Sequence, residues 1–283
     1  MSGLSTPVTV EAALPPPAPP RRRQSWGGVL LRWSVLLTMA LYYFVPVGAA
    51  FEFSLRDKGN VHDLSAYRRI IAEPDLVGTL GTSLRIAAGT IVLTLLLVVP
   101  TVTWVHLRVP HLRRLVEGLS ILPLVIPAVV LVTGVLSAFS AAPNLIKGTP
   151  VILSLEYVVL ALPFTYRAID VGVSSIDVRT LVEAARGLGA GWGTVLLRVV
   201  APNIRAAILG ASFLTLALVL GEFTMASLML FTTFPVWIVV IGQSQAAGAV
   251  ALSIFSLVFA WLLLFALSLA GGRPRRRTSR STA

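Results

Sequence analysis

Long apolar runs alternate with shorter polar segments along the whole chain. Each run holds about 20 residues, the number that an α-helix needs to cross the hydrocarbon of a bilayer. We predict six such runs, over residues 29–53, 84–105, 115–139, 151–171, 204–230 and 246–269. The pattern therefore predicts an all-α integral membrane protein with six transmembrane helices within residues 26–271.

The segments outside these runs differ from one another in composition. Residues 1–25 contain a proline-rich stretch followed by three arginines, and we expect a disordered cytoplasmic tail there. A cleaved signal peptide is the alternative, but the apolar stretch from Val29 is longer than a signal peptide has. The segment between the first two runs mixes acidic and basic residues, and we expect an outside loop carrying a short helix. Residues 272–283 form a second, basic tail.

Composition and charge support the membrane assignment. Hydrophobic residues make up 56 % of the 283 residues and charged residues only 12 %, with a mean hydropathy of +0.86. The net charge of +11 would suggest nucleic-acid binding in a soluble protein. Here the basic residues lie mainly between and beyond the apolar runs, so membrane topology explains them and no nucleic-acid partner is expected. The positive-inside rule places both termini in the cytoplasm.

Residues 174–203 are too polar and too rich in glycine to span the membrane. Ser174 and Ser175 can cap a short amphipathic helix, whose apolar positions recur every three or four residues (Val178, Leu181, Val182, Ala185). Glycines at alternate positions then favour a tight turn (Gly187, Gly189, Gly191, Gly193). The same apolar spacing returns from Trp192 to Val199 and stops at Pro202. The pattern predicts a helix, a turn and a second helix lying along the membrane.

This segment resembles the signature of the transmembrane permease subunits of bacterial binding-protein-dependent ABC importers. That signature is Glu-Ala-Ala, three residues, Gly, nine residues and Ile-x-Leu-Pro, in the cytoplasmic loop before the penultimate helix. Here Glu183, Ala184 and Ala185 are followed at the same spacing by Gly189 and then by Val199-Val200-Ala201-Pro202. Valine replaces isoleucine and Ala201 replaces leucine, and both positions remain apolar. The resemblance extends over about residues 64–270.

The resemblance implies an importer assembled from several chains in the bacterial inner membrane. In the family this element, between the fourth and fifth helices, is a coupling helix that inserts into a groove of a cytoplasmic ATP-binding subunit. A second permease, the same or different, and an extracytoplasmic solute-binding protein complete the complex. The coupling residues would be Glu183, Ala184, Ala185, Gly189, Val199 and Pro202. Small alanine side chains allow a partner to approach closely, and Glu183 offers a carboxylate. An amphipathic helix resting on lipid headgroups is the alternative.

The sequence lacks the patterns of an enzyme or a metal protein. No phosphate-binding G-x-x-x-x-G-K-[ST] occurs, so ATP and magnesium are expected to bind the partner subunit, and no cofactor is expected in this chain. Cysteine is absent, and His62, His106 and His111 lack metal-ligand spacing. A serine hydrolase acting through Ser244 would need a histidine late in the chain, and none follows His111. A non-ABC carrier or channel fits six helices but leaves the Glu183 segment unexplained.

The nature of the solute rests on fewer residues. Leu162-Pro163-Phe164 with Arg167, and the triplet Gly221-Glu222-Phe223, resemble permeases serving polyamines, aminoethylphosphonate, iron(III), sulfate and molybdate. Carboxylates in or beside the spans favour a polyamine-like or aminophosphonate solute (Glu52, Glu156, Glu222). Glu222 is predicted to lie deepest, within the fifth run. It is expected either to line the translocation path or to hydrogen-bond to a neighbouring helix and fix packing.

Overall fold

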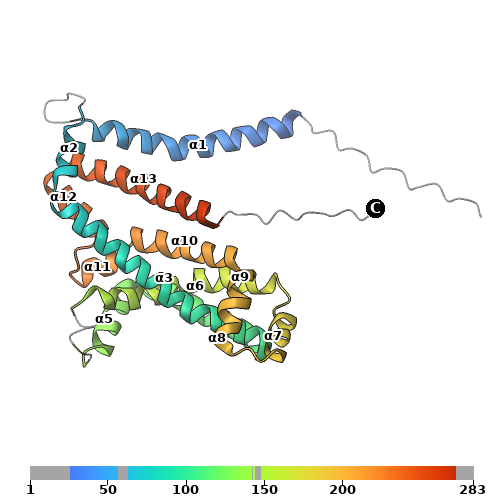
Figure 1. Ribbon diagram of the computed structural model, residues 1–283. Coiled ribbons are helices and arrows are strands. Elements are labelled where there is room, and N and C mark those ends of the chain that lie inside the picture. The colour runs from blue at the N-terminus through green and yellow to red at the C-terminus, as the bar shows by residue number, and fades with distance from the viewer. Residues whose placement is uncertain (1–25, 57–62, 142, 144–147, 272–283) are drawn as a thin grey trace, which may run out of the picture. The chain divides into compact units, whose positions relative to one another are not determined.

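The computed structural model describes residues 26–56, 63–141, 143 and 148–271, and every element within these ranges is helical (Figure 1). The tails predicted at residues 1–25 and 272–283 lie outside the described residues. The chain divides into two compact units, one ending at Ala49 and the other beginning at Ala50. The first unit consists, as far as it is described, of α1 (Trp26–Ser54) up to the boundary, and this helix is a candidate membrane span.

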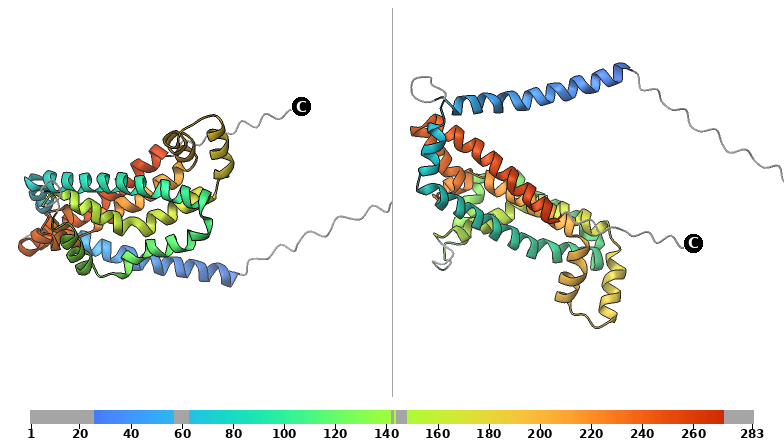
Figure 2. Two further views of the ribbon diagram at one scale, coloured as in Figure 1. Left: turned by 90° about the horizontal axis from the view of Figure 1, so that it is seen from below. Right: turned by 45° about the horizontal axis from the view of Figure 1, so that its top comes forward.

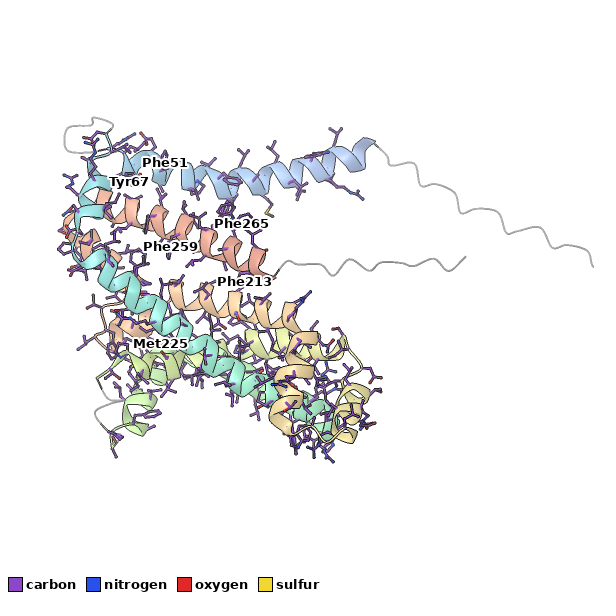
Figure 3. The ribbon with its side chains drawn as sticks, in the orientation of Figure 1. Phe51, Tyr67, Phe213, Met225, Phe259 and Phe265 are labelled. Atoms are coloured by element: carbon purple, nitrogen blue, oxygen red, sulfur yellow. The ribbon has the colours of Figure 1, made fainter. Side chains whose placement is uncertain are left out.

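The second unit is a helical bundle. In chain order, after the end of α1, it contains α2 (Ser65–Ala72), α3 (Asp75–Arg108), η1 (Pro110–Leu112), α4 (Arg113–Val125), α5 (Ala128–Ala138), α6 (Pro150–Ser174), α7 (Val178–Gly187), α8 (Trp192–Thr194), η2 (Val195–Val200), α9 (Ala201–Asn203), α10 (Arg205–Gly221), α11 (Thr224–Leu228), α12 (Phe234–Ser244) and α13 (Ala246–Gly271). The short helix expected in the first loop is present as α2. The hydroxyl groups of Ser54, the last residue of α1, and Tyr67, in α2, lie 2.7 Å apart. Figure 3 labels Tyr67 on α2.

Helix α6 lies at the centre of this bundle. It packs against α3, α4 and α10, and α3 and α10 also contact each other (Figure 2). Gly172 lets α6 and α10 approach closely, because a Cβ at this position would lie 2.3 Å from the Cβ of Ala207. Large apolar side chains remain exposed along α3 and α13, including those of Leu96 and Trp261. Such surfaces suit contact with lipid or with another membrane chain.

Four helices are long and apolar enough to cross a membrane, namely α1, α3, α6 and α13. The number rises to six only if each of two bent helix pairs counts as one span. The single helix predicted over 115–139 is instead a bent pair, because α4 and α5 meet at an angle of 104°. Ile126 between them has an extended backbone, with ψ at 126°, as is typical of a residue before proline, and Pro127 has no N–H to continue the helix.

The prediction of a single helix over 204–230 is wrong. Helix α10 ends at Gly221, Glu222 is extended, and the short α11 begins only at Thr224. At its other end, α10 makes an angle of 85° with the helical segment Trp192–Asn203. The apolar helix α12 was not predicted as an element, and at 11 residues it is too short to cross a bilayer by itself.

Candidate functional site

Helix α7 forms where the amphipathic helix was predicted, but its cap differs from the prediction. Ser174 belongs to α6, and the Ser175 hydroxyl donates to the carbonyl of Gly172. Asp177 is the N-cap: its carboxylate accepts hydrogen bonds from the backbone N–H of Thr180 at 3.3 Å and from the Thr180 hydroxyl at 2.7 Å. The bond from the Thr180 hydroxyl is the larger cause, and with the backbone bond it holds the pKa of Asp177 below its ordinary value.

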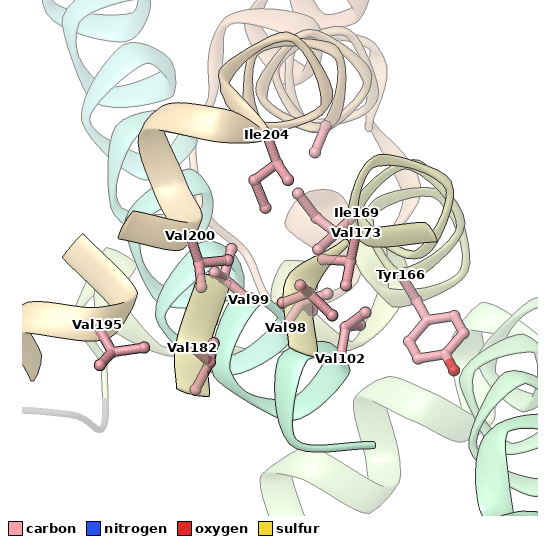
Figure 4. Close-up of a cluster of buried hydrophobic side chains, with 12 residues drawn as sticks. Val98, Val99, Val102, Tyr166, Ile169, Val173, Val182, Val195, Val200 and Ile204 are labelled. Carbon is pink, nitrogen blue, oxygen red and sulfur yellow. The ribbon is translucent and has the colours of Figure 1, made fainter. Parts of the chain in front are cut away.

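One face of α7 is rooted in the core. Val178 and Val182 are buried in a cluster with residues of α3, α6, η2 and α10. Figure 4 shows Val182 and Val200 beside Val99 of α3 within this cluster. Helix α7 therefore packs on one end of α3, a helix of 34 residues that contains Pro100 beside Val99.

The opposite face of α7 carries two of the predicted coupling residues, Glu183 and Ala184. Glu183 and Ala184 are exposed, and Ala185 is half-buried at the edge of the core. The Glu183 carboxylate lies 3.9 Å from Arg179, and both side chains remain mostly exposed, at 73 % and 66 %. A contact this long and this exposed holds Glu183 weakly, so the carboxylate is available to a partner.

The turn after α7 depends on one glycine. Gly189 has φ of +83°, the left-handed region that favours glycine. Its N–H donates to the carbonyl of Arg186, and the N–H of Ala190 donates to the carbonyl of Ala185, each at 3.0 Å. This pair of bonds is the Schellman motif that ends many helices. The turn presents Leu188 to solvent, with 90 % of its surface exposed.

The second helix of the segment is less regular than predicted. It passes from α8 through a π-helical turn, η2, into α9, and it continues past Pro202 to Asn203. The π turn places Val195 and Val200 in the core, whereas the predicted face included Val199, which is only half-buried. The wider turn accounts for this shift, because it brings residues five apart onto one face. Pro202 is exposed.

Helix α7, the turn at Gly189 and the helical segment Trp192–Asn203 together form a hairpin. Two tryptophans connect this hairpin to the end of α3, a feature that the sequence analysis missed. The rings of Trp104 and Trp192 have centroids 5.9 Å apart. Arg108 lies over Trp104 at 5.9 Å and Arg186 over Trp192 at 5.4 Å, both in cation–π geometry. A cavity of about 280 Å³ lies beside them, lined by Leu107, Arg108, Arg179, Val182, Glu183, Arg186 and Trp192. A tryptophan near a span end with arginine four residues later was the available signal.

A buried ionic contact fixes the same ends of α3, α4 and α6. Asp170 is fully buried, and its Oδ2 accepts a hydrogen bond of 2.6 Å from Arg113. The Nε2 atom of His106 lies 3.6 Å from the other oxygen of Asp170 and 3.2 Å from the Ser174 hydroxyl. The sequence analysis assigned His106 no role beyond its lack of metal-ligand spacing, and the structure places it in this network. The contact connects the ends of α3, α4 and α6 that lie next to the hairpin.

Glu222 lies at the break between α10 and α11 and not within a helix. Its Oε2 accepts a hydrogen bond of 2.8 Å from the Tyr157 hydroxyl of α6, and its Oε1 accepts one of 2.9 Å from the N–H of Met225 at the start of α11. The carboxylate therefore caps α11 and joins it to α6. These bonds match the packing role that the sequence analysis left open.

Glu156, the residue before Tyr157 in α6, has no such partners. It is 2 % exposed, and neither carboxylate oxygen forms a hydrogen bond within the described residues. An ionised carboxylate in such a place is costly, so a cation or a proton is needed to neutralise it. Within the described ranges, no group of three or more His, Cys, Asp or Glu side chains is arranged to hold a metal ion.

Comparisons with known proteins give the fold. No protein-family model matches the sequence, and it has no match among curated proteins. Among solved structures, the chain is similar to one from the crystal structure of a bacterial alginate ABC transporter in complex with an alginate pentasaccharide-bound periplasmic protein. The similarity has a TM-score of 0.61 at 15 % identity and covers 90 % of this chain and 96 % of the other. At this identity the similarity shows a shared fold.

Proposed function

We propose that the chain is a permease subunit of a binding-protein-dependent ABC importer in a bacterial inner membrane, with both termini in the cytoplasm. The observation that carries the proposal is the exposed hairpin bearing Glu183, Ala184, Ala185 and Gly189, rooted through Val182 in the core. The fold shared with a chain of an ABC transporter supports it. In this role the chain is not an enzyme.

The proposed partners are those of the resembling importers, in which other chains bind ATP and deliver the solute. Cytoplasmic ATP-binding subunits would hold ATP and magnesium and would receive α7. A second permease, the same or different, would share the translocation path, and an extracytoplasmic solute-binding protein would deliver a small charged solute. The proposed solute is polyamine-like or an aminophosphonate.

The hairpin suggests how ATP-driven movement reaches the membrane. A partner that binds the exposed face of α7 would push against a helix whose other face packs on α3. The Trp104–Trp192 contact would carry the movement of the second helix to the same end of α3. The Asp170–Arg113 pair would keep α4 and α6 moving with it.

Reconstitution tests the proposal. The purified chain alone should show no ATP hydrolysis at a transporter's rate, and the assembled complex in vesicles should take up solute only with ATP and the ATP-binding subunits present. Transport by this chain without those subunits would contradict the proposal and would favour a carrier or channel.

A further inference from the structure

Arg85 of α3 is an exposed side chain beside a cleft. Its Nε donates to the carbonyl of Gly81 at 3.2 Å, and no carboxylate of the described residues forms an ion pair with it. Arg85 lies about 15 Å along α3 from its first residue, in the extracytoplasmic half of the span in the proposed orientation. The side chain is exposed, so the guanidinium can reach water or meet an anion near the membrane surface.

The guanidinium borders a cavity. A space of about 370 Å³ between α3 and α6 is lined by Thr82, Arg85, Ile86, Gly89, Leu93, Pro150, Val151 and Ser154. The floor is open because Gly89 has no side chain, and a Cβ there would lie 3.2 Å from the Ser154 hydroxyl. Among the described lining residues Arg85 carries the charge, Thr82 and Ser154 carry hydroxyl groups, and the others are apolar.

Two hydroxyl groups accompany the arginine. The Thr82 hydroxyl donates to the carbonyl of Gly78 at 2.9 Å and keeps its lone pairs free to accept. The Ser154 hydroxyl is directed at the carbonyl of Ile86, but at 3.4 Å this bond is long. Ser154 can therefore turn its hydrogen to a better acceptor at little cost.

We propose that the cleft beside Arg85 binds an oxyanion of the phosphate or phosphonate class. The Arg85 Nε is bonded to the carbonyl of Gly81, so its two terminal NH2 groups are the donors for such a group, and the Ser154 hydroxyl is a further donor that lines the same cleft. The apolar walls lower the local dielectric and strengthen these bonds. A cation would be repelled from the same cleft, because no acidic residue lines it.

This inference rests on the proposed function where it bears on the solute. Of the two proposed classes, an aminophosphonate carries the required oxyanion and a polyamine does not. The same chemistry is also offered by the phosphate of a phospholipid headgroup, which could reach a cleft near the membrane surface. The experiment must therefore separate a soluble ligand from a lipid.

Binding to the purified full chain in an uncharged detergent is the test. Inorganic phosphate and methylphosphonate are the oxyanion probes, and spermidine is the cationic comparison. Arg85→Gln should weaken binding of the oxyanion probes by about tenfold or more, the loss expected for a charge-assisted hydrogen bond. Arg85→Lys keeps the positive charge but not the planar array of guanidinium donors, so its affinity for the oxyanion probes should fall between those of the wild type and Arg85→Gln. Arg68→Gln is the matched control, since it removes the same charge from an exposed residue of α2 outside the cleft.

Native mass spectrometry of the phospholipid retained by the protein shows whether the bound oxyanion belongs to a soluble ligand or to a lipid headgroup. Displacement of this lipid by methylphosphonate, or probe binding without any lipid, supports a soluble ligand. Lipid that is lost with Arg85→Gln but is not displaced by either probe supports a headgroup. Oxyanion binding equal in Arg85→Gln and wild type, or absence of both probe and lipid binding, overturns the proposal. Copurification of the ATP-binding subunits, which should not change with Arg85→Gln, reports separately on the proposed function.

Discussion

Substitution of Gly189 isolates the contribution of the hairpin turn. A Cβ at Gly189 would meet nothing within 4 Å in this chain, so Gly189→Leu introduces no clash with the turn itself. The cost comes from the backbone instead, because φ of +83° is unfavourable for any residue with a Cβ. For leucine this amounts to about 1–2 kcal/mol.

That cost predicts how often the turn opens. A penalty of about 1–2 kcal/mol raises the population of the opened turn by about 5- to 30-fold. The N–H of Ala190, which is bonded to the carbonyl of Ala185, should exchange its hydrogen faster by the same factor. Hydrogen exchange of the full chain in lipid nanodiscs measures this rate. Gly189→Asn should show a smaller rise, because asparagine tolerates the left-handed region better than leucine does.

Gly191→Leu is the matched control for this experiment. Gly191 has the same open space around its Cβ position, but its φ is −73°, which any residue adopts. In Gly191→Leu the exchange rate of the Ala190 N–H should therefore stay near that of the wild type. Equal acceleration in both variants, or none in Gly189→Leu, would refute the argument that backbone conformation at Gly189 holds the hairpin together.

Three further substitutions test other contacts. Glu222→Gln should lower the free energy of unfolding by about 1–3 kcal/mol. Its effect should not add to that of Tyr157→Phe, because the two side chains share one hydrogen bond. Unchanged stability with altered solute preference would favour a path-lining role. Glu156→Gln should leave thermal stability of the isolated chain unchanged or raised, since it removes an unpartnered carboxylate; a fall in melting temperature would reveal a partner for the charge. The pKa of Asp177 is lowered in the folded chain, so its capping contribution is present above the unfolded-state pKa and is lost as pH falls through the folded one. Hydrogen-exchange protection factors of α7 should therefore drop in acid, and Asp177→Asn should remove the drop; an equal drop in that variant would assign it to another group.

The sequence predicted the parts of the fold that depend on composition and periodicity. The apolar runs located the helices of the bundle, and the spacing of Val178 and Val182 predicted the buried face of α7. The motif pointed to an exposed Glu183, and the structure exposes it. The role of these residues in coupling stays a prediction.

The features that the sequence did not predict depend on local breaks and on distant contacts. Hydropathy reports that residues 115–139 are apolar, but it is insensitive to the sharp bend before Pro127. Glu222 falls at a helix end because α10 stops at Gly221, so its partner Tyr157 could not be inferred from spacing. The contact of Trp104 with Trp192 joins residues 88 positions apart, and periodicity carries no information at that separation.

Docking of α7 on an ATP-binding subunit is the central claim, and site-specific crosslinking in the assembled complex tests it most directly. Since the chain has no cysteine, Ala185→Cys and Leu188→Cys each introduce a single reactive thiol at the hairpin. Ile71→Cys, on an exposed residue of α2, is the control on the other side of the membrane in the proposed orientation. We predict thiol crosslinks to the ATP-binding subunit from Ala185→Cys and Leu188→Cys and none from Ile71→Cys. No crosslink from either hairpin position across several linker lengths, or equal crosslinking from α2, would contradict the account.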